Sequence, residues 1–312
     1  MRRQRILVGV GLGLALACGL AGITLRPPAA RAAASSQLTL GVFLPTTIAD
    51  GQERFNFGEH LAAALAKALG RPVQARNFAR YQDFADAASH GKLDIGVVDG
   101  WIAAQSSDKF VPVALGSLGG ETRLRWAIIA HQGRSVADLA GRRLSLTHGA
   151  GPTDVQFVSN VVFGGDLAAQ KHFKLVYVPA VESAIKMIDV DSAEAALIPV
   201  VHVPKKSRVL YRSSPVLAAA VLSLRGNANE LRAALGSVGA VAPFDKFVTT
   251  RTEDVASLRK LIIQGPPPRQ PFMAEAPILR FDSRQVITFR GIGLVFPSFV
   301  HYMDVSKELP DD

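Results

Sequence analysis

Short apolar runs alternate with segments of helical period from Gln37 onward, and this alternation restricts the folds open to the chain. Gly70 ends the first helical segment and Gly91 ends the second. Strands that alternate with helices of ten or so residues form βαβ units, whose sheet is mostly parallel and covered by helices on both faces. The pattern therefore predicts an α/β fold. The expected elements are strands at 37–44, 73–77 and 95–98 and helices at 55–69 and 81–90.

The same rhythm restarts in the middle of the chain, after apolar runs at 111–118 and 124–131. Two similar α/β blocks in one chain predict two lobes with a cleft between them. A strand at 216–222 and helices at 229–238 and 253–263 precede a proline-rich tail. The elements expected in the second block are strands at 143–146, 174–178 and 195–199 and helices at 135–139, 153–163 and 181–189.

The beginning of the chain has the layout of an export signal. Three arginines precede the uncharged, largely apolar residues 6–25, and an Ala30-x-Ala32 pattern follows. This order is typical of a secretory signal peptide, which we predict at residues 1–32. The alternative is an uncleaved membrane anchor at 6–25, because the apolar stretch just reaches spanning length. In either case we expect the rest of the chain in the periplasm or another extracytoplasmic space.

The positive charge of the chain belongs largely to that segment. The formal net charge is +9, and residues 1–32 hold five arginines and no acid, so the remainder carries +4 (9 − 5). The only cysteine, Cys18, lies in the same segment, so the exported part has neither a disulfide nor a cysteine-rich metal site. No extended basic patch remains, and we expect no nucleic-acid partner.

The sequence lacks the motifs of common enzyme chemistry. None of its seven histidines has a second one at metal-ligand spacing, the closest pair being His131 and His148. Neither a Walker-type phosphate loop nor a nucleophile elbow occurs. We therefore expect no catalytic residue, no metal and no cofactor, and keep an enzyme only as an alternative.

Polar residues follow two strands of the first block. Ligands of α/β lobes bind beyond the carboxyl ends of the strands, where loops and helix N-termini meet. Thr46 and Thr47 follow the first strand and offer hydroxyls to an anion; alternatively, they form an ordinary turn. Asp99 and Trp101 follow the third strand, as an acceptor for an amine and as a stacking surface. The alternative roles are a helix N-cap for Asp99 and a core position for Trp101.

The loop between a strand and a helix at 147–153 is the strongest local signal of the second block. Two glycines, a proline and a threonine there can present backbone N–H groups to an anion at a helix N-terminus. The alternative is an ordinary strand-to-helix turn. The candidate ligand-binding residues of this loop are Thr147, His148, Gly149, Gly151 and Thr153.

Two charged residues complete the candidate site. Arg125, together with Arg123, is placed by strand alternation on one face, where it serves as a bidentate anion clamp or as a solvated strand arginine. Glu182 begins a helix, where a carboxylate is also favoured by the helix dipole alone.

Five stretches, taken in order, form a family pattern. They comprise a helix that leads into a Leu-Gly-x-x-Val strand, a tyrosine-led helix, a Gly-x-x-Asp turn, an Asp-Leu-x-Gly entry into the second block, and a late helix with its strand. They stand at 57–73, 81–84, 91–96, 136–144 and 182–187 with 195–199. Between about Leu38 and Leu235 the chain thereby resembles the phosphate/phosphite/phosphonate substrate-binding proteins of ABC transporters.

The resemblance implies a type II periplasmic binding protein, in which two lobes joined by two crossing strands, near 119–126 and 211–216, close on a ligand. It implies that Tyr81 contacts that ligand; the alternative role of Tyr81 is a helix-start aromatic packed on its own lobe. The implied function is capture of a small anionic, phosphate- or phosphonate-like solute for an ABC permease or another membrane partner, by a monomer. The expected bounds are 37–122 plus about 216–290 for the first lobe, 123–215 for the second lobe and 291–312 for a C-terminal tail.

Three features depart from the family pattern. The loop at 147–153 lacks the usual hydroxyl-rich run, 179–182 lacks the usual glycine and histidine, and the tail from Gly265 has no counterpart. These departures bear on the ligand and leave the fold expectation unchanged. A membrane-anchored sensory or accessory envelope module without a role in transport is the alternative function.

Overall fold

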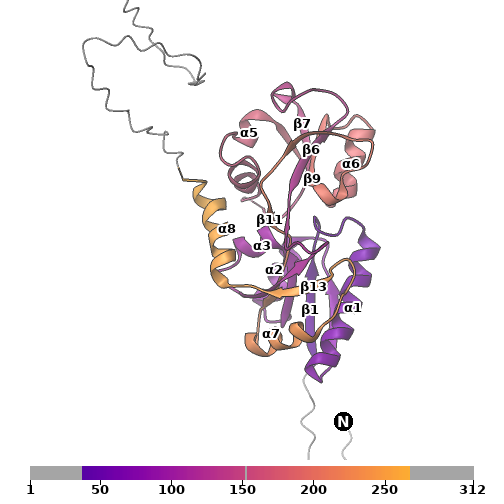
Figure 1. Cartoon of the computed structure of the whole chain (residues 1–312), viewed down its shortest axis with the longest axis vertical. Coiled ribbons are helices and arrows are strands. Elements are labelled where there is room, and N and C mark those ends of the chain that lie inside the picture. Colours follow the sequence, from indigo (N-terminus) through magenta and orange to yellow (C-terminus); the bar gives the residue numbers. More distant parts are fainter. Residues whose placement is uncertain (1–36, 152, 268–312) are drawn as a thin grey trace, which may run out of the picture. The chain divides into compact units, whose positions relative to one another are not determined.

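The computed structural model describes residues 37–267 except residue 152. These residues form two main sheets, each flanked by helices, and a short two-stranded ladder (Figure 1). The α/β class with two lobes predicted from the sequence is confirmed. The predicted signal segment at 1–32 and the predicted tail at 291–312 lie outside the described residues. Within the part of the chain that the structure describes, no helix combines the length and the apolarity needed to span a membrane.

The first sheet has six strands in the order β13-β4-β12-β3-β1-β2. β1 pairs in parallel with β2 and β3, whereas β12 lies antiparallel between β3 and β4. The sheet is therefore mixed rather than mostly parallel, because β12 is entered from the other lobe and not through a helical crossover. The strands are β1 (Leu38–Phe43), β2 (Val73–Asn77), β3 (Ile95–Asp99), β4 (Val111–Ser117), β12 (Ala219–Ser223) and β13 (Lys246–Thr249).

Helices cover both faces of this sheet. α1 and α7 pack over one apolar core, and α2, α3 and α8 contribute to another. α1 starts four residues before the predicted helix, because the Asp50 side chain accepts a hydrogen bond from the Glu53 N–H (2.7 Å) and caps it there. The helices are α1 (Gly51–Leu69), α2 (Tyr81–Ser89), α3 (Gly100–Gln105), α7 (Ala228–Ser237) and α8 (Thr252–Gln264).

The second sheet has five strands in the order β10-β6-β9-β7-β8. β7 is parallel to β8 and β9, and β6 is antiparallel to β9 and β10. The strands are β6 (Trp126–Ala130), β7 (Arg143–Thr147), β8 (Lys174–Val178), β9 (Ala195–Pro199) and β10 (Arg208–Arg212). Its helical segments are η1 (Ala137–Leu139), α4 (Asp154–Gln156), η2 (Phe157–Val162), α5 (Ala169–His172), α6 (Val181–Asp189) and η3 (Val200–His202).

The helix predicted at 153–163 is irregular. It starts as the single α-turn α4 and continues as the π-helix η2. The side-chain amide of Asn160 in η2 donates to the Ile262 carbonyl of α8 (2.7 Å), so α8 bridges the two halves of the molecule. A π-segment widens the helix and often marks a functional site.

The chain passes between the two sheets twice. β5 (Arg123–Leu124) and β11 (Val216–Leu217) pair antiparallel as a ladder of their own. They coincide with the two crossings that the family resemblance implies. We call the part with the first sheet the first lobe and the part with the second sheet the second lobe. The exact lobe boundaries stay a prediction, since the described residues up to Pro266 belong to one compact unit.

One apolar core runs through both lobes. It includes Phe43 and Trp101 from the first lobe and Trp126 and Phe157 from the second. A second core lies between the first sheet and α1 and α7, and a small one lies under α6. The lobes are therefore packed against each other through apolar side chains.

Candidate functional site: the cleft between the lobes

A cavity of about 350 Å³ lies between the lobes. It is formed where β1 ends, where α2 begins, and where β7 and β8 end. These are carboxyl ends of strands and one helix N-terminus, the places where α/β lobes bind ligands. The lining residues are Phe43, Ala79, Arg80, Tyr81 and Gln82 from the first lobe and His148, Gly149, Tyr177, Val178 and Pro179 from the second.

Aromatic side chains dominate both walls of this cavity. On the first-lobe wall, the rings of Phe43 and Tyr81 are 5.9 Å apart between centroids. On the second-lobe wall, the rings of His148 and Tyr177 are 5.5 Å apart. Burial, with a smaller contribution from the charge of Asp154, raises the pKa of Tyr177 to about 12, so its hydroxyl stays protonated at neutral pH.

The threonines after β1 are held by Asp99. The Thr46 N–H (2.9 Å), the Thr46 hydroxyl (2.6 Å) and the Thr47 N–H (3.0 Å) all donate to its carboxylate. The Thr47 hydroxyl donates to the Ala218 carbonyl (2.9 Å). Asp99 is fully buried, and burial raises its pKa against the opposing effect of these hydrogen bonds. Asp99 thus organises the β1 loop; it stands at the N-cap position of α3, but its side chain makes no capping hydrogen bond there.

The loop after β7 has a corresponding carboxylate, Asp154. It accepts hydrogen bonds from the Gly149 N–H (2.9 Å), the Gly151 N–H (3.1 Å) and Nδ1 of His148 (3.0 Å). Asp154 is buried, and burial raises its pKa while the Gly149 and His148 contacts lower it. The backbone N–H groups that the sequence predicts for an anion therefore point to Asp154. The Thr153 side chain makes no capping hydrogen bond to α4.

Trp101 of the first lobe is buried in the second. Its ring stacks on Phe157 with 4.5 Å between centroids and 19° between planes, and it meets Trp126 edge-on at 6.5 Å. A Cβ atom on Gly149 would lie 1.7 Å from Cη2 of Trp101, so only glycine fits there. Beside Trp101 and Thr147 only about 10 Å³ of space remains, about the least that holds one water molecule. Trp101 therefore fills the inner end of the cleft.

The lobes also meet through His202, which sequence reasoning missed. Its Nε2 lies 3.1 Å from both the Thr46 and the Thr47 carbonyl oxygens. Burial lowers the pKa of His202, against a smaller opposite effect of these two carbonyls. The neutral imidazole with its proton on Nε2 donates to both oxygens and links η3 to the β1 loop.

The sequence candidates separate into two groups. Tyr81, His148 and Gly149 line the cavity, whereas the remaining ones do not. Arg125 donates to the Ser213 carbonyl (3.0 Å) and ties the two crossing segments together. Glu182 lies in the first turn of α6. As ligand-binding residues, all of the candidates stay predictions.

Two cavity residues, Phe43 and Tyr177, escaped the sequence analysis. Each stands at or next to the carboxyl end of a strand, so the rule that selected Thr46 and Asp99 also applies to them. Their apolar character hid them, because apolar residues at strand ends are expected in the core. Asp154 was missed because an acidic residue in the first turn of a helix is common, and Asp154 is the first residue of α4.

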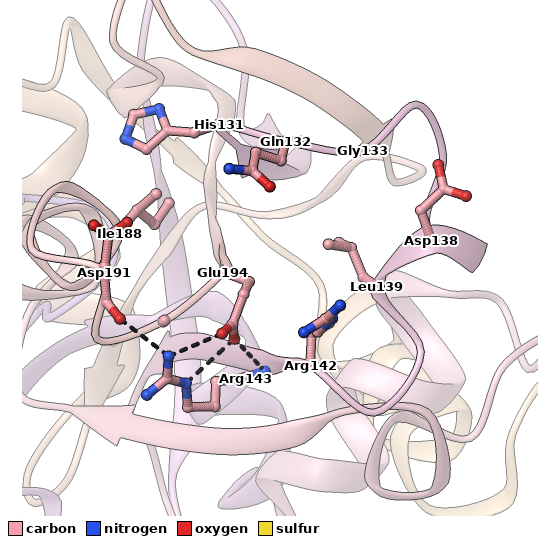
Figure 2. A pocket seen from close by; sticks show the side chains of 11 residues that line it. His131, Gln132, Gly133, Asp138, Leu139, Arg142, Arg143, Ile188, Asp191 and Glu194 are labelled. Atoms are coloured by element: carbon pink, nitrogen blue, oxygen red, sulfur yellow. Dashed lines mark hydrogen bonds and ion pairs between the residues drawn. The ribbon is translucent and has the colours of Figure 1, made fainter.

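A second cavity, of about 500 Å³, lies at the opposite end of the second sheet (Figure 2). Two of its charged groups, Arg143 and Glu194, are paired with each other. The Arg143 guanidinium contacts the Glu194 carboxylate at 2.8 Å and the Asp191 carbonyl at 3.0 Å, and Arg143 lowers the pKa of Glu194 to about 2. Arg143 begins β7, whose other end borders the interlobe cavity. The lining residues all lie between His131 and Glu194, so this cavity is formed by the second lobe alone. We assign the candidate site to the interlobe cavity.

Two α/β lobes joined by two crossing strands, with a cavity between them, define a type II periplasmic binding protein. The described residues offer no cluster of His, Cys, Asp and Glu that could hold a metal ion. The family model of ABC transporter phosphonate periplasmic substrate-binding proteins matches residues 50–238, more than half of the chain. The chain belongs to this family. Its members are extracytoplasmic solute-binding proteins, not enzymes, and work with a small-molecule ligand and a membrane permease.

Solved structures show the same fold at low sequence identity. The binding-protein component of an ABC phosphonate transporter from Pseudomonas aeruginosa has a TM-score of 0.60 and 14% identity, over 73% of this chain and 85% of that one. PhnD1 from Prochlorococcus marinus, in complex with methylphosphonate, has a TM-score of 0.60 and 10% identity, over 72% and 96%. XAC2383 from Xanthomonas citri, bound to ATP, has a TM-score of 0.57 and 14% identity, over 74% of this chain and 99% of that one. No curated protein matches the sequence.

Proposed function

We propose that this protein captures a small organic acid of the phosphonate type in its interlobe cavity and delivers it to an ABC permease. The observation that carries the proposal is the composition of the cavity, whose walls come from both lobes. A solute there contacts both halves of the molecule at once. Binding therefore favours the closed arrangement, which differs in shape from an open one and provides the signal to the permease.

An acid group finds favourable surroundings at the rim of this cavity. Arg80 lines it and is the N-cap residue of α2, where no side chain caps the helix. Pro179 lines it as well and leads into α6, whose N-cap residue Ala180 also provides no side-chain cap. Helix N-termini attract anions through their N–H groups and dipoles. The Arg80 guanidinium forms an ion pair with Asp83 in the first turn of α2 (2.8 Å), so a bound acid would share Arg80 with that carboxylate.

The shared fold does not determine the ligand. Among the similar solved structures, PhnD1 is bound to methylphosphonate and XAC2383 to ATP, which differ greatly in size. The ligand class has to come from the cavity of this chain. We further propose that residues 1–32 act as the export signal and that the protein works as a monomer.

The test is a thermal-shift screen of the purified protein with phosphonates, sulfonates and carboxylates. A ligand at about a hundred times its dissociation constant stabilises the folded state by about 2.7 kcal/mol, which raises the melting temperature by about 5 °C or more. The shift should be lost in Tyr81→Ala and kept in Arg142→Ala, whose side chain lines the cavity of Figure 2. The absence of a thermal shift with every compound of the screen, or loss of the shift only in Arg142→Ala, would refute the assignment.

A further inference from the structure

We propose that the cleft selects solutes that carry an aromatic or similarly flat ring and rejects bare inorganic oxyanions. The proposal rests on the proposed function and specifies the ligand class of the same cavity. Three observations carry it: the inner end of the cleft is filled, backbone N–H donors of both polar loops are already paired with carboxylates, and the walls that remain are aromatic.

The inner end of the cleft is closed by the protein itself. The Trp101 ring occupies it, stacked on Phe157 and in contact with Gly149. The space left beside it accommodates a water molecule but no phosphate. A ligand is therefore confined to the outer cavity of about 350 Å³, at the small end of the usual range of ligand pockets.

The loops that would grip a small oxyanion are engaged by buried carboxylates. Asp99 takes up both N–H groups and one hydroxyl of the Thr46–Thr47 turn, and Asp154 takes up two glycine N–H groups of the β7 loop. An oxyanion could gain these donors only by displacing a carboxylate. The displaced carboxylate would stay buried without its donors, next to a second negative charge. Bare phosphate has no other group with which to offset that loss.

The remaining walls suit a ring. Tyr81 and Phe43 face the cavity from the first lobe, and Tyr177 and His148 face it from the second. Tyr177 is 39% exposed, which leaves its ring accessible to a ligand. A flat ring between these walls removes apolar area of both partners from water and stacks on their faces. Its acid substituent then stays at the rim, beside Arg80.

The test is calorimetric titration of the purified protein with three probes: inorganic phosphate, methylphosphonate and phenylphosphonate. We expect phenylphosphonate to bind at least tenfold more tightly than methylphosphonate, and phosphate to give no binding heat. Tyr177→Ala should weaken phenylphosphonate binding at least tenfold, and Tyr177→Phe should restore most of it. The matched control is Phe55→Ala, which removes a 50%-exposed ring of α1 that does not line the cavity.

The failures of the two proposals are distinguishable. Binding of phosphate or methylphosphonate as tight as that of phenylphosphonate overturns the ring selectivity and leaves the proposed function standing. Equal loss in Tyr177→Ala and Phe55→Ala, or no loss in either, also overturns it. If none of the three probes binds, the ring selectivity is overturned as well. The proposed function fails only if the thermal-shift screen of phosphonates, sulfonates and carboxylates also shows no binding.

Discussion

The six-membered ring of Trp101 lies directly on the Cα atom of Gly149, so that a Cβ atom at position 149 would approach Cη2 of the indole to 1.7 Å. The two residues belong to different lobes. The fit between a tryptophan of one lobe and a glycine of the other therefore sets how closely the lobes can approach.

A methyl group at position 149 should push the lobes apart. Because the backbone cannot yield at such a short distance, Gly149→Ala should displace Trp101 from Phe157 and cost about 1–3 kcal/mol of the free energy of unfolding. Its tryptophan fluorescence should shift to longer wavelength as the indole meets water. The control is Gly236→Ala in α7, where a Cβ meets nothing within 4 Å and stability should be unchanged or slightly higher. Identical urea midpoints for the two variants would contradict this relationship.

Removal of the carboxylate of Asp99 should be far more costly than removal of a surface carboxylate. Asp99→Ala leaves two backbone N–H groups and one hydroxyl buried without an acceptor, at a cost of about 3 kcal/mol or more. Asp108→Asn, which breaks the half-exposed ion pair with Arg259, should change the free energy of unfolding by about 0.5 kcal/mol or less. Urea denaturation measures both. A loss below about 1 kcal/mol for Asp99→Ala would mean that the β1 loop does not depend on Asp99.

His202 should make the protein less stable in mild acid. Its pKa in the folded state lies below the ordinary value of 6.5 because the imidazole is buried. The unfolded chain therefore binds the proton more readily, and stability is lost as the pH falls through about 6.5 towards the folded-state pKa. His202→Gln keeps a side-chain donor for the Thr46 and Thr47 carbonyls without the titration. Its free energy of unfolding should fall less than that of the wild type between about pH 7.5 and about pH 6, and parallel profiles would exclude His202 as the cause.

The link between α8 and η2 predicts a local effect. Asn160→Ala deletes the donor to the Ile262 carbonyl and should cost about 1 kcal/mol. Hydrogen exchange of the last turn of α8 should accelerate, because that turn loses its contact with the second lobe. The amides of α1 should exchange as in the wild type, since α1 packs against α7 and β2 on the other face. Uniform acceleration in both helices would indicate global destabilisation instead.

The fold class could be predicted from the alternation of strands and helices, since each period reports locally which face of an element is buried. The contents of the site could be predicted only in part. Thr46 and Asp99 were found by the strand-end rule, but their mutual hydrogen bonds join residues 53 positions apart, which spacing does not reveal. Trp101 posed a similar problem, because its burial depends on a glycine of the other lobe. The spacing of apolar residues also does not distinguish the π-helix η2 from an α-helix.

The central claim is that a ring-bearing acid binds between the lobes, and a crystal structure with phenylphosphonate tests it most directly. We predict the phenyl ring in the interlobe cavity between Tyr81 and Tyr177, with the phosphonate at the α2 rim near Arg80 and Trp101 still seated on Gly149. A ligand in the cavity beside Arg142 (Figure 2), or a phosphonate bonded to the Thr46–Thr47 turn in place of Asp99, would contradict the account.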